Sequence, residues 1–167
     1  AYEIPKRDWS SNVCSSDLVV REDSQRREIL RVSRAVEPID IALLVDTSAA
    51  LGNSMAPMRQ ALTSFVSLMV PDNQIAIVGL ADRPTILADY TSNRGLLDKA
   101  IGRVFAMSSS GMTLLDAIWE ISNGLKRREA TRAEIVPVIT NGAEFSNRYA
   151  RDVIGAVRGA GAGLQAV

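Results

Sequence analysis

The sequence predicts an α/β fold, with a mostly parallel sheet covered by helices. Three observations lead to this prediction. Apolar runs of strand length alternate with segments of helical periodicity, as in repeated strand–helix–strand units. The runs are nearly unbroken, which is typical of strands buried on both faces. Polar loops follow several of these runs, at the edge where such sheets bind ligands. We therefore expect a Rossmann-like, doubly wound sheet with helices on both faces.

The first residues of the chain do not fit this alternation. Residues 8–18 (DWSSNVCSSDL) are similar to the translation of a common sequencing adapter, with one departure at Asn12. We therefore expect residues 1–18 to be non-native or disordered, the alternative being an ordinary polar loop. On the adapter interpretation Trp9 and Cys14 carry no functional meaning.

A short β-hairpin is expected next, within residues 19–37. Two runs with a rough two-residue alternation, at 18–23 and 27–36, flank polar turn residues at 22–26. Two strands alone are marginally stable. This hairpin is therefore expected to end an upstream β-region or to pack on the domain after it.

The main domain is expected over residues 38–167 and opens with a buried strand at 39–45. Ser54 is expected to cap the helix after this strand. One apolar stripe at helical spacing defines this helix: Met55, Met58, Leu62, Phe65, Val66 and Met69. A second buried strand is expected at 74–81.

A shorter strand at 85–90 comes so soon after it that we expect the two to pair antiparallel, at an edge of the sheet. Asn93 is expected to cap the next helix, and Thr113 to open another after a loop of small residues at 106–112. The apolar stripes of these two helices are Leu96, Leu97, Ile101 and Val104, and then Leu114, Leu115, Ile118, Ile121 and Leu125.

A third buried strand is expected at 134–140, where Pro137 indicates a position near an edge or a bulge. Residues 141–142 (NG) form a turn, and Ser146 is expected to cap a helix. The apolar face of that helix carries Val153, Ile154 and Val157. A glycine-rich turn and a strand cut off in mid-course are expected over 159–167, so we expect the domain to be truncated at its C-terminus.

Composition excludes several classes of function. The 167 residues include no histidine and one cysteine, which excludes Ser-His-Asp and Cys-His nucleophiles and a Cys/His zinc site. Basic and acidic residues balance at 19 each, which argues against a nucleic-acid binder. No apolar run reaches the ~18 residues of a membrane span. We therefore expect a chain that is not an enzyme, with no nucleic-acid partner and no membrane span.

Three loops are expected at the carboxyl edge of the sheet, at 46–53, 106–113 and 141–146. The motifs there are DTSAA (46–50), GMT (111–113) and TNG (140–142). This pattern resembles the von Willebrand factor A (VWA) domain. In that family the metal-ion-dependent adhesion site (MIDAS) uses Asp-x-Ser-x-Ser in the first loop, a Thr in the second and an Asp in the third. The resemblance covers about residues 38–167 and includes the strand order, so it implies the VWA fold.

The resemblance implies that Asp46, Ser48, Thr113 and Asn141 stand at metal-binding positions. Two of five positions depart from the family: Ala50 replaces a hydroxyl and Asn141 replaces a carboxylate. Mg²⁺ prefers six oxygens in a near-octahedral array. We therefore expect weak Mg²⁺ binding or none, and no other cofactor.

The resemblance also implies a protein-binding or adhesion module. Its partner-binding face is expected to include Ala50, Gly111, Met112 and Glu144, and Glu144 is a candidate to replace part of the lost charge. In the family a Glu or Asp of the partner can supply the missing oxygen and complete the coordination of the metal ion. Alternatives are a partner-recruiting subunit of a chelatase-like ATPase, or a rigid spacer in a surface protein. Residues 18–36 resemble the segment before this domain in a bacterial subfamily of exported proteins, which favours a secreted or extracytoplasmic location.

Each of these residues also has a purely structural interpretation. Asp46 can accept hydrogen bonds from its own loop, and Ser48 is at home in a turn. Thr113 with Asp116 is a capping-box-like pair. Asn141 before glycine is a common turn dipeptide. Only their placement on three converging loops favours the site.

Overall fold

The computed structural model describes residues 18–29, 37–108, 110–140 and 142–167. The chain divides into two units, residues 1–36 and 37–167, and each is described by itself. The segment that resembles an adapter, apart from Leu18, lies outside the described residues.

The described part of the first unit is a β-hairpin, as predicted. Strands β1 (Val20–Glu22) and β2 (Gln25–Arg27) pair antiparallel. Asp23 and Ser24, the two residues between them, both have positive φ. Such turns match the right-handed twist of the strands they join. The predicted second strand at 27–36 is wrong at its start, because β2 ends at Arg27; residues 30–36 are outside the described part.

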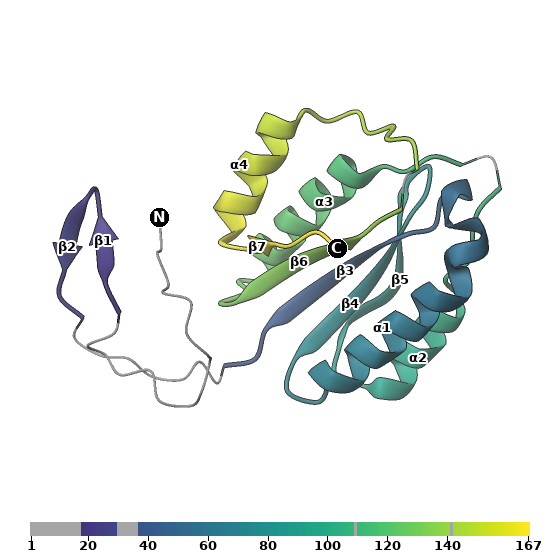
Figure 1. Cartoon of the computed structure of the whole chain (residues 1–167), viewed down its shortest axis with the longest axis horizontal. Helices are drawn as coiled ribbons and strands as arrows, with labels where there is room; N and C mark the ends of the chain where they lie inside the picture. Colours follow the sequence, from purple (N-terminus) through teal and green to yellow (C-terminus); the bar gives the residue numbers. More distant parts are fainter. Residues whose placement is uncertain (1–17, 30–36, 109, 141) are drawn as a thin grey trace. The chain divides into compact units, whose positions relative to one another are not determined.

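The second unit contains a five-stranded sheet in the order β5-β4-β3-β6-β7 (Figure 1). Only β5 is antiparallel to its neighbour, so the predicted mostly parallel sheet with an antiparallel edge strand is confirmed. The strands are β3 (Asp40–Asp46), β4 (Gln74–Leu80), β5 (Pro84–Thr91), β6 (Ala133–Val138) and β7 (Gly163–Leu164).

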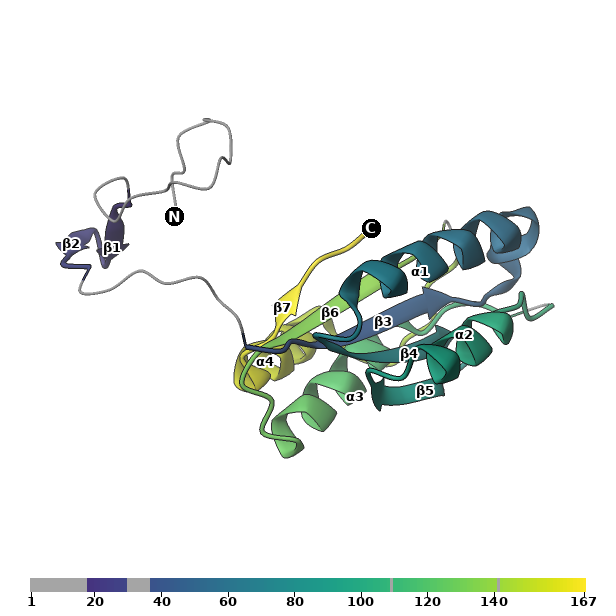
Figure 2. The ribbon, with the colours of Figure 1, turned by 90° about the horizontal axis from the view of Figure 1, so that it is seen from below.

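Helices cover both faces of this sheet (Figure 2). One core cluster joins β3 and β4 to α1 (Met55–Met69) and α2 (Arg94–Gly102). Another joins them and β6 to α3 (Leu114–Arg127) and α4 (Ala150–Ala160). Alternate side chains of a strand point to opposite faces, which is why central strands here are apolar throughout. The doubly wound α/β fold is therefore confirmed.

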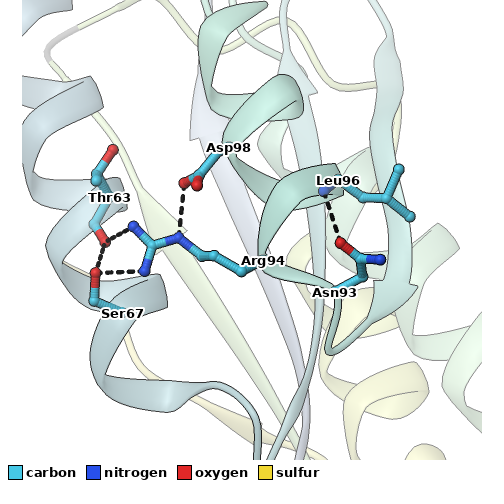
Figure 3. A network of polar contacts seen from close by, with 6 residues as sticks. All are labelled: Thr63, Ser67, Asn93, Arg94, Leu96 and Asp98. Carbon is cyan, nitrogen blue, oxygen red and sulfur yellow. Dashed lines mark hydrogen bonds and ion pairs between the residues drawn. The ribbon is translucent and has the colours of Figure 1, made fainter.

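A polar network ties α2 to α1 (Figure 3). Arg94, the first residue of α2, donates to Asp98 at 2.8 Å and to Ser67 Oγ of α1 at 2.6 Å. Just before it, the Asn93 side chain accepts a hydrogen bond from the Leu96 N–H at 3.2 Å. The predicted cap of this helix is confirmed, because a side-chain oxygen satisfies an amide that has no partner inside the helix.

Helices α1 and α3 begin directly after Ser54 and Thr113, as predicted, but none of the three other predicted side-chain caps forms. Ser54 makes no capping bond, since a 3₁₀ segment, η2 (Ala49–Ser54), leads into α1. Thr113 makes none either. Ser146 does not cap α4, which begins at Ala150 after Tyr149. The Ser146 hydroxyl instead accepts the Asp116 N–H of α3 at 3.1 Å. Tertiary partners have taken over bonds that local sequence assigned to the helix itself.

Pro137 lies near an edge of the sheet, as predicted, and not at a bulge. Its strand, β6, lies between β3 and β7, and Pro137 is in regular register with Leu44. Its carbonyl accepts the Val167 N–H at 2.9 Å, so the residue faces the β7 side. Proline has no N–H, so the hydrogen bond that it cannot donate is one to the last segment of the chain. The pairing with β3 does not need it.

Candidate functional site

The first predicted loop is joined to the second by backbone hydrogen bonds. Thr47 donates to Leu80 at the end of β4 at 2.8 Å, and its carbonyl accepts the Met107 N–H at 2.9 Å. Ala49 donates to the Ser110 carbonyl at 3.2 Å. These bonds hold the loop after β3 against the segment between α2 and α3.

The second loop is joined to the third in the same way. Met112 donates to the Ala143 carbonyl at 2.9 Å, and Phe145 donates to the Met112 carbonyl at 2.8 Å. A Cβ at Gly111 would overlap the ring of Phe145, so the absence of a side chain lets that ring lie on the backbone. The three predicted loops thus lie together at the carboxyl edge of the sheet.

Asp46, the last residue of β3, is the polar centre of this edge. Its side chain is fully buried. Oδ1 accepts the Ser48 N–H at 2.8 Å, and Oδ2 accepts both the N–H of Thr140 at 3.1 Å and its hydroxyl. Burial raises the pKa of Asp46, but these hydrogen bonds from Thr140 and Ser48 outweigh it and lower the pKa below the usual value. The carboxylate therefore ties the first loop to the third.

Ser48 lies beside this carboxylate and is also fully buried. Its hydroxyl has no hydrogen-bond partner among the described residues. A Cβ at Gly142 would lie 2.7 Å from that hydroxyl, 3.4 Å from Ala50 Cβ and 3.6 Å from Asp46 Oδ2. The backbone of the third loop therefore comes close to the first. Asn141, the neighbouring predicted site residue, lies outside the described part of the chain.

Thr113, from the second loop, is buried and donates its hydroxyl to the Ala81 carbonyl at 3.0 Å. Ala81 directly follows Leu80, whose register partner in the sheet is Asp46. Thr113 is thus anchored one residue beyond the end of β4, next to the end of β3 that carries the buried carboxylate. Its oxygen keeps acceptor capacity after this bond.

Glu144, the candidate replacement for the lost carboxylate, binds the start of α3. One carboxylate oxygen accepts the Leu114 N–H at 3.1 Å and the other accepts the Ser146 N–H at 2.6 Å. The Asp116 carboxylate in turn accepts the Asn147 N–H at 3.1 Å. Negative side chains at a helix N-terminus satisfy free amides and match the helix dipole. The third loop therefore caps α3 from outside that helix.

This arrangement offers few free oxygens to a metal ion. Asp46 already accepts three hydrogen bonds, and Ala50 has no side-chain oxygen to give. Ser48 Oγ is the one oxygen of the site shown to be buried and unpaired among the described residues. In that part of the chain no three His, Cys, Asp or Glu side chains gather into a cluster that could hold a metal ion.

Thr140 and Gly142 are the site residues that sequence reasoning did not single out. Thr140 supplies two of the bonds to Asp46, and Gly142 sets how near the third loop comes. The sequence signal that could have identified these two residues is a hydroxyl side chain at the end of a buried strand, followed by Asn-Gly.

The family comparison agrees with this geometry. The family model of the von Willebrand factor type A domain matches residues 41–144, more than half of the chain. This chain belongs to that family. VWA domains typically mediate protein–protein interaction or adhesion and are generally not enzymes. No curated protein matches the chain by sequence.

Solved structures show the same VWA fold. A form of proximal thread matrix protein 1 from the mussel byssus, with a zinc-occupied MIDAS motif, is 19% identical, with TM-score 0.61; the match covers 78% of this chain and 35% of that one. The vWF domain of the pilus tip protein Mfa5 from Porphyromonas gingivalis is 18% identical, with TM-score 0.59; the match covers 71% of this chain and 44% of that one. The von Willebrand factor type A structure from Catenulispora acidiphila is 17% identical, with TM-score 0.60; the match covers 79% of this chain and 32% of that one.

The chain spans less than half the length of each of these three proteins. At such identities the likeness concerns the fold alone. In the part of the chain that the structure describes, no helix is both long and apolar enough to cross a membrane.

Proposed function

We propose that this VWA domain binds protein partners through the loop edge, using a degenerate MIDAS that holds Mg²⁺ weakly or not at all. The observation that supports this most directly is the bonding of Asp46. Its carboxylate is held by Ser48 and Thr140, so the loops stay together without an ion. Such a site offers the partner a preformed protein surface and not a metal ion with an open coordination position.

Apolar side chains around the three loops support a metal-independent contact. Met107 and Phe145 are 45% and 63% exposed, and both belong to segments bonded to the loops of the site. Exposed large apolar groups at one place are a mark of interaction surfaces. The partner contacts are therefore expected to be apolar.

An extracellular location is part of the proposal. It rests on analogy with two relatives of the same fold, a pilus tip protein and a protein of the mussel byssus. The proposed location needs a test of its own. Fractionation of cells that carry a tagged full-length parent protein would supply it, and retention inside the cell would contradict the proposal.

Metal binding is tested by calorimetric titration of Mg²⁺. The wild-type chain is expected to show no binding at micromolar concentration. The double variant Asn141→Asp with Ala50→Ser restores one carboxylate and one hydroxyl and is expected to bind. Asn123→Asp adds the same charge on α3, away from the loops, and should leave the titration unchanged. Micromolar or tighter binding by the wild-type chain contradicts the proposal.

The partner surface is tested with a photo-crosslinking residue placed at Phe145. The control places the same residue at Leu68 on α1, which is 82% exposed and carries no part of the site. A specific partner is expected to crosslink at position 145 and not at 68, with equal yield in Mg²⁺ and in chelator. Loss of the product in chelator would show that the contact needs an ion.

A further inference from the structure

Met107 differs from the other methionines of the domain in its exposure to solvent. The chain has five methionines and one cysteine, Cys14, which lies outside the described residues. The methionines of α1 pack against one core cluster: Met55, Met58 and Met69. Met112 is 4% exposed and belongs to the core on the opposite face, whereas Met107 belongs to neither core and is 45% exposed. Its thioether is therefore the sulfur of residues 37–167 that solvent reaches most easily.

The backbone of Met107 is fixed although its side chain is exposed. Its N–H donates to the Thr47 carbonyl at 2.9 Å, and its own carbonyl accepts the Ser110 hydroxyl at 2.8 Å. Thr47 stands between Asp46 and Ser48 in the first loop of the site. Met107 therefore presents its sulfur from a fixed place beside the residues that organise the loop edge.

An exposed thioether reacts with a two-electron oxidant such as hydrogen peroxide. The sulfur lone pair takes one oxygen of the peroxide, the O–O bond breaks, and the other oxygen leaves as water after proton transfer. Sulfur is oxidised as the peroxide is reduced, so the step needs no further reactant. The product, methionine sulfoxide, is polar where the thioether was apolar, and it disrupts contacts that methionine makes.

We propose that Met107 is an oxidation site that controls partner binding at the loop edge, with hydrogen peroxide as the oxidant. This inference rests on the function proposed above, in which Met107 and Phe145 supply exposed apolar groups to the contact. The thioether suits an apolar partner, and the sulfoxide weakens the contact because a polar group must then be buried in it. Oxidation at this position removes no core contact, so the fold is expected to keep its stability.

The oxidation site is tested by brief treatment of the folded full chain with dilute hydrogen peroxide, followed by peptide mapping with tandem mass spectrometry. Sulfoxide is expected at Met107 about tenfold or more faster than at Met112, because a buried group reacts only after local opening. Met112 is a matched control, since it lies in the same segment between α2 and α3. Equal rates at the two positions would overturn the proposal.

The effect on binding is measured with the photo-crosslinking residue at position 145. The chain is oxidised alone, and catalase removes the peroxide before the partner is added. Oxidation is expected to reduce the crosslinked product about fivefold or more, and methionine sulfoxide reductase should restore it. Met107→Leu keeps the apolar bulk without sulfur and should crosslink equally before and after peroxide. Met107→Gln should crosslink weakly without any oxidation.

Two results at this step would overturn the inference. One is an unchanged yield from wild-type chain whose Met107 is oxidised, and the other is an equal loss of yield in Met107→Leu. Thermal unfolding of each sample shows that the chain is still folded. No product at position 145 in the reduced wild type would instead contradict the function proposed for the loop edge, and the peptide map then decides the oxidation site by itself.

Discussion

At the scale of single residues, one buried carboxylate organises the loop edge. Asp46 is fully buried and accepts hydrogen bonds from two different loops. A buried charge is tolerated only when its lone pairs are satisfied. The bonds from Ser48 and Thr140 meet this condition.

Asp46→Asn is expected to lower the free energy of unfolding by about 1–3 kcal/mol at neutral pH. The amide nitrogen cannot accept a hydrogen bond, so it faces donors of Ser48 or Thr140 that are left unpaired. Urea unfolding measures the difference. Asp72→Asn, in an exposed turn, is the control and should change little. An equal effect of the two substitutions would show that the buried bonds contribute nothing.

The Asp46→Asn variant also tests how the stability of the protein depends on pH. The folded-state pKa of Asp46 lies below its ordinary value of 3.8. The carboxylate therefore contributes its full stability above that pH and loses it as pH falls from 3.8 through the folded pKa. The stability difference between wild type and Asp46→Asn should shrink over that acid window in a pH series of unfolding curves. A difference that stays constant there would contradict the assignment.

Gly142→Ala tests how closely the third loop approaches the first. The added Cβ would lie 2.7 Å from Ser48 Oγ and 3.4 Å from Ala50 Cβ. We expect a loss of about 1–3 kcal/mol, the usual cost of overpacking a buried site, measured by thermal unfolding. Gly102→Ala, where an added Cβ meets nothing within 4 Å, is the control. A fully stable Gly142→Ala protein would mean that the two loops lie further apart than described.

At the scale of elements, α3 depends on a loop some thirty residues further along the chain. Its first amides are bonded to Glu144 and Ser146, while Thr113 directs its hydroxyl to Ala81. Thr113 and Asp116 therefore do not form a capping box, because residues of the third loop accept hydrogen bonds from the first amides of α3 instead. The position of that loop and the start of α3 are coupled.

Glu144→Ala is expected to destabilise the protein by about 1 kcal/mol, as the loss of a helix cap does. Amide exchange at Leu114 should rise with it, because that N–H loses its acceptor. Glu120→Ala removes an exposed carboxylate from the middle of the same helix and should do neither. Unchanged exchange at Leu114 would show that Glu144 does not cap α3.

At the scale of the whole domain, stability comes from two apolar layers, one on each face of the sheet. We expect the three loops to stay joined without an ion, through the bonds to Asp46. Chelator is therefore expected to leave the Tm of the wild-type chain unchanged in thermal unfolding. The Asn141→Asp, Ala50→Ser variant should gain a Mg²⁺-dependent Tm, because an ion that binds only the folded state stabilises it. A Tm of the wild type that falls in chelator would contradict this view.

The alternation of apolar runs was sufficient to predict the sheet, its antiparallel edge and the helices on both faces. The periodic stripe of α1 and the cap at Asn93 are local properties, and local physics decided them. The placement of Asp46, Ser48 and Thr113 on loops at one edge also followed, because carboxyl ends of parallel strands meet there.

Partners distant in the sequence decided the rest. Which donors bond Asp46, whether α3 is capped by Thr113 or by Glu144, and whether Pro137 disturbs the sheet depend on groups brought together only by folding. Periodicity reports which residues are buried, because burial is set by the solvent. It does not report which donor reaches which acceptor, because that is set by how the loops pack.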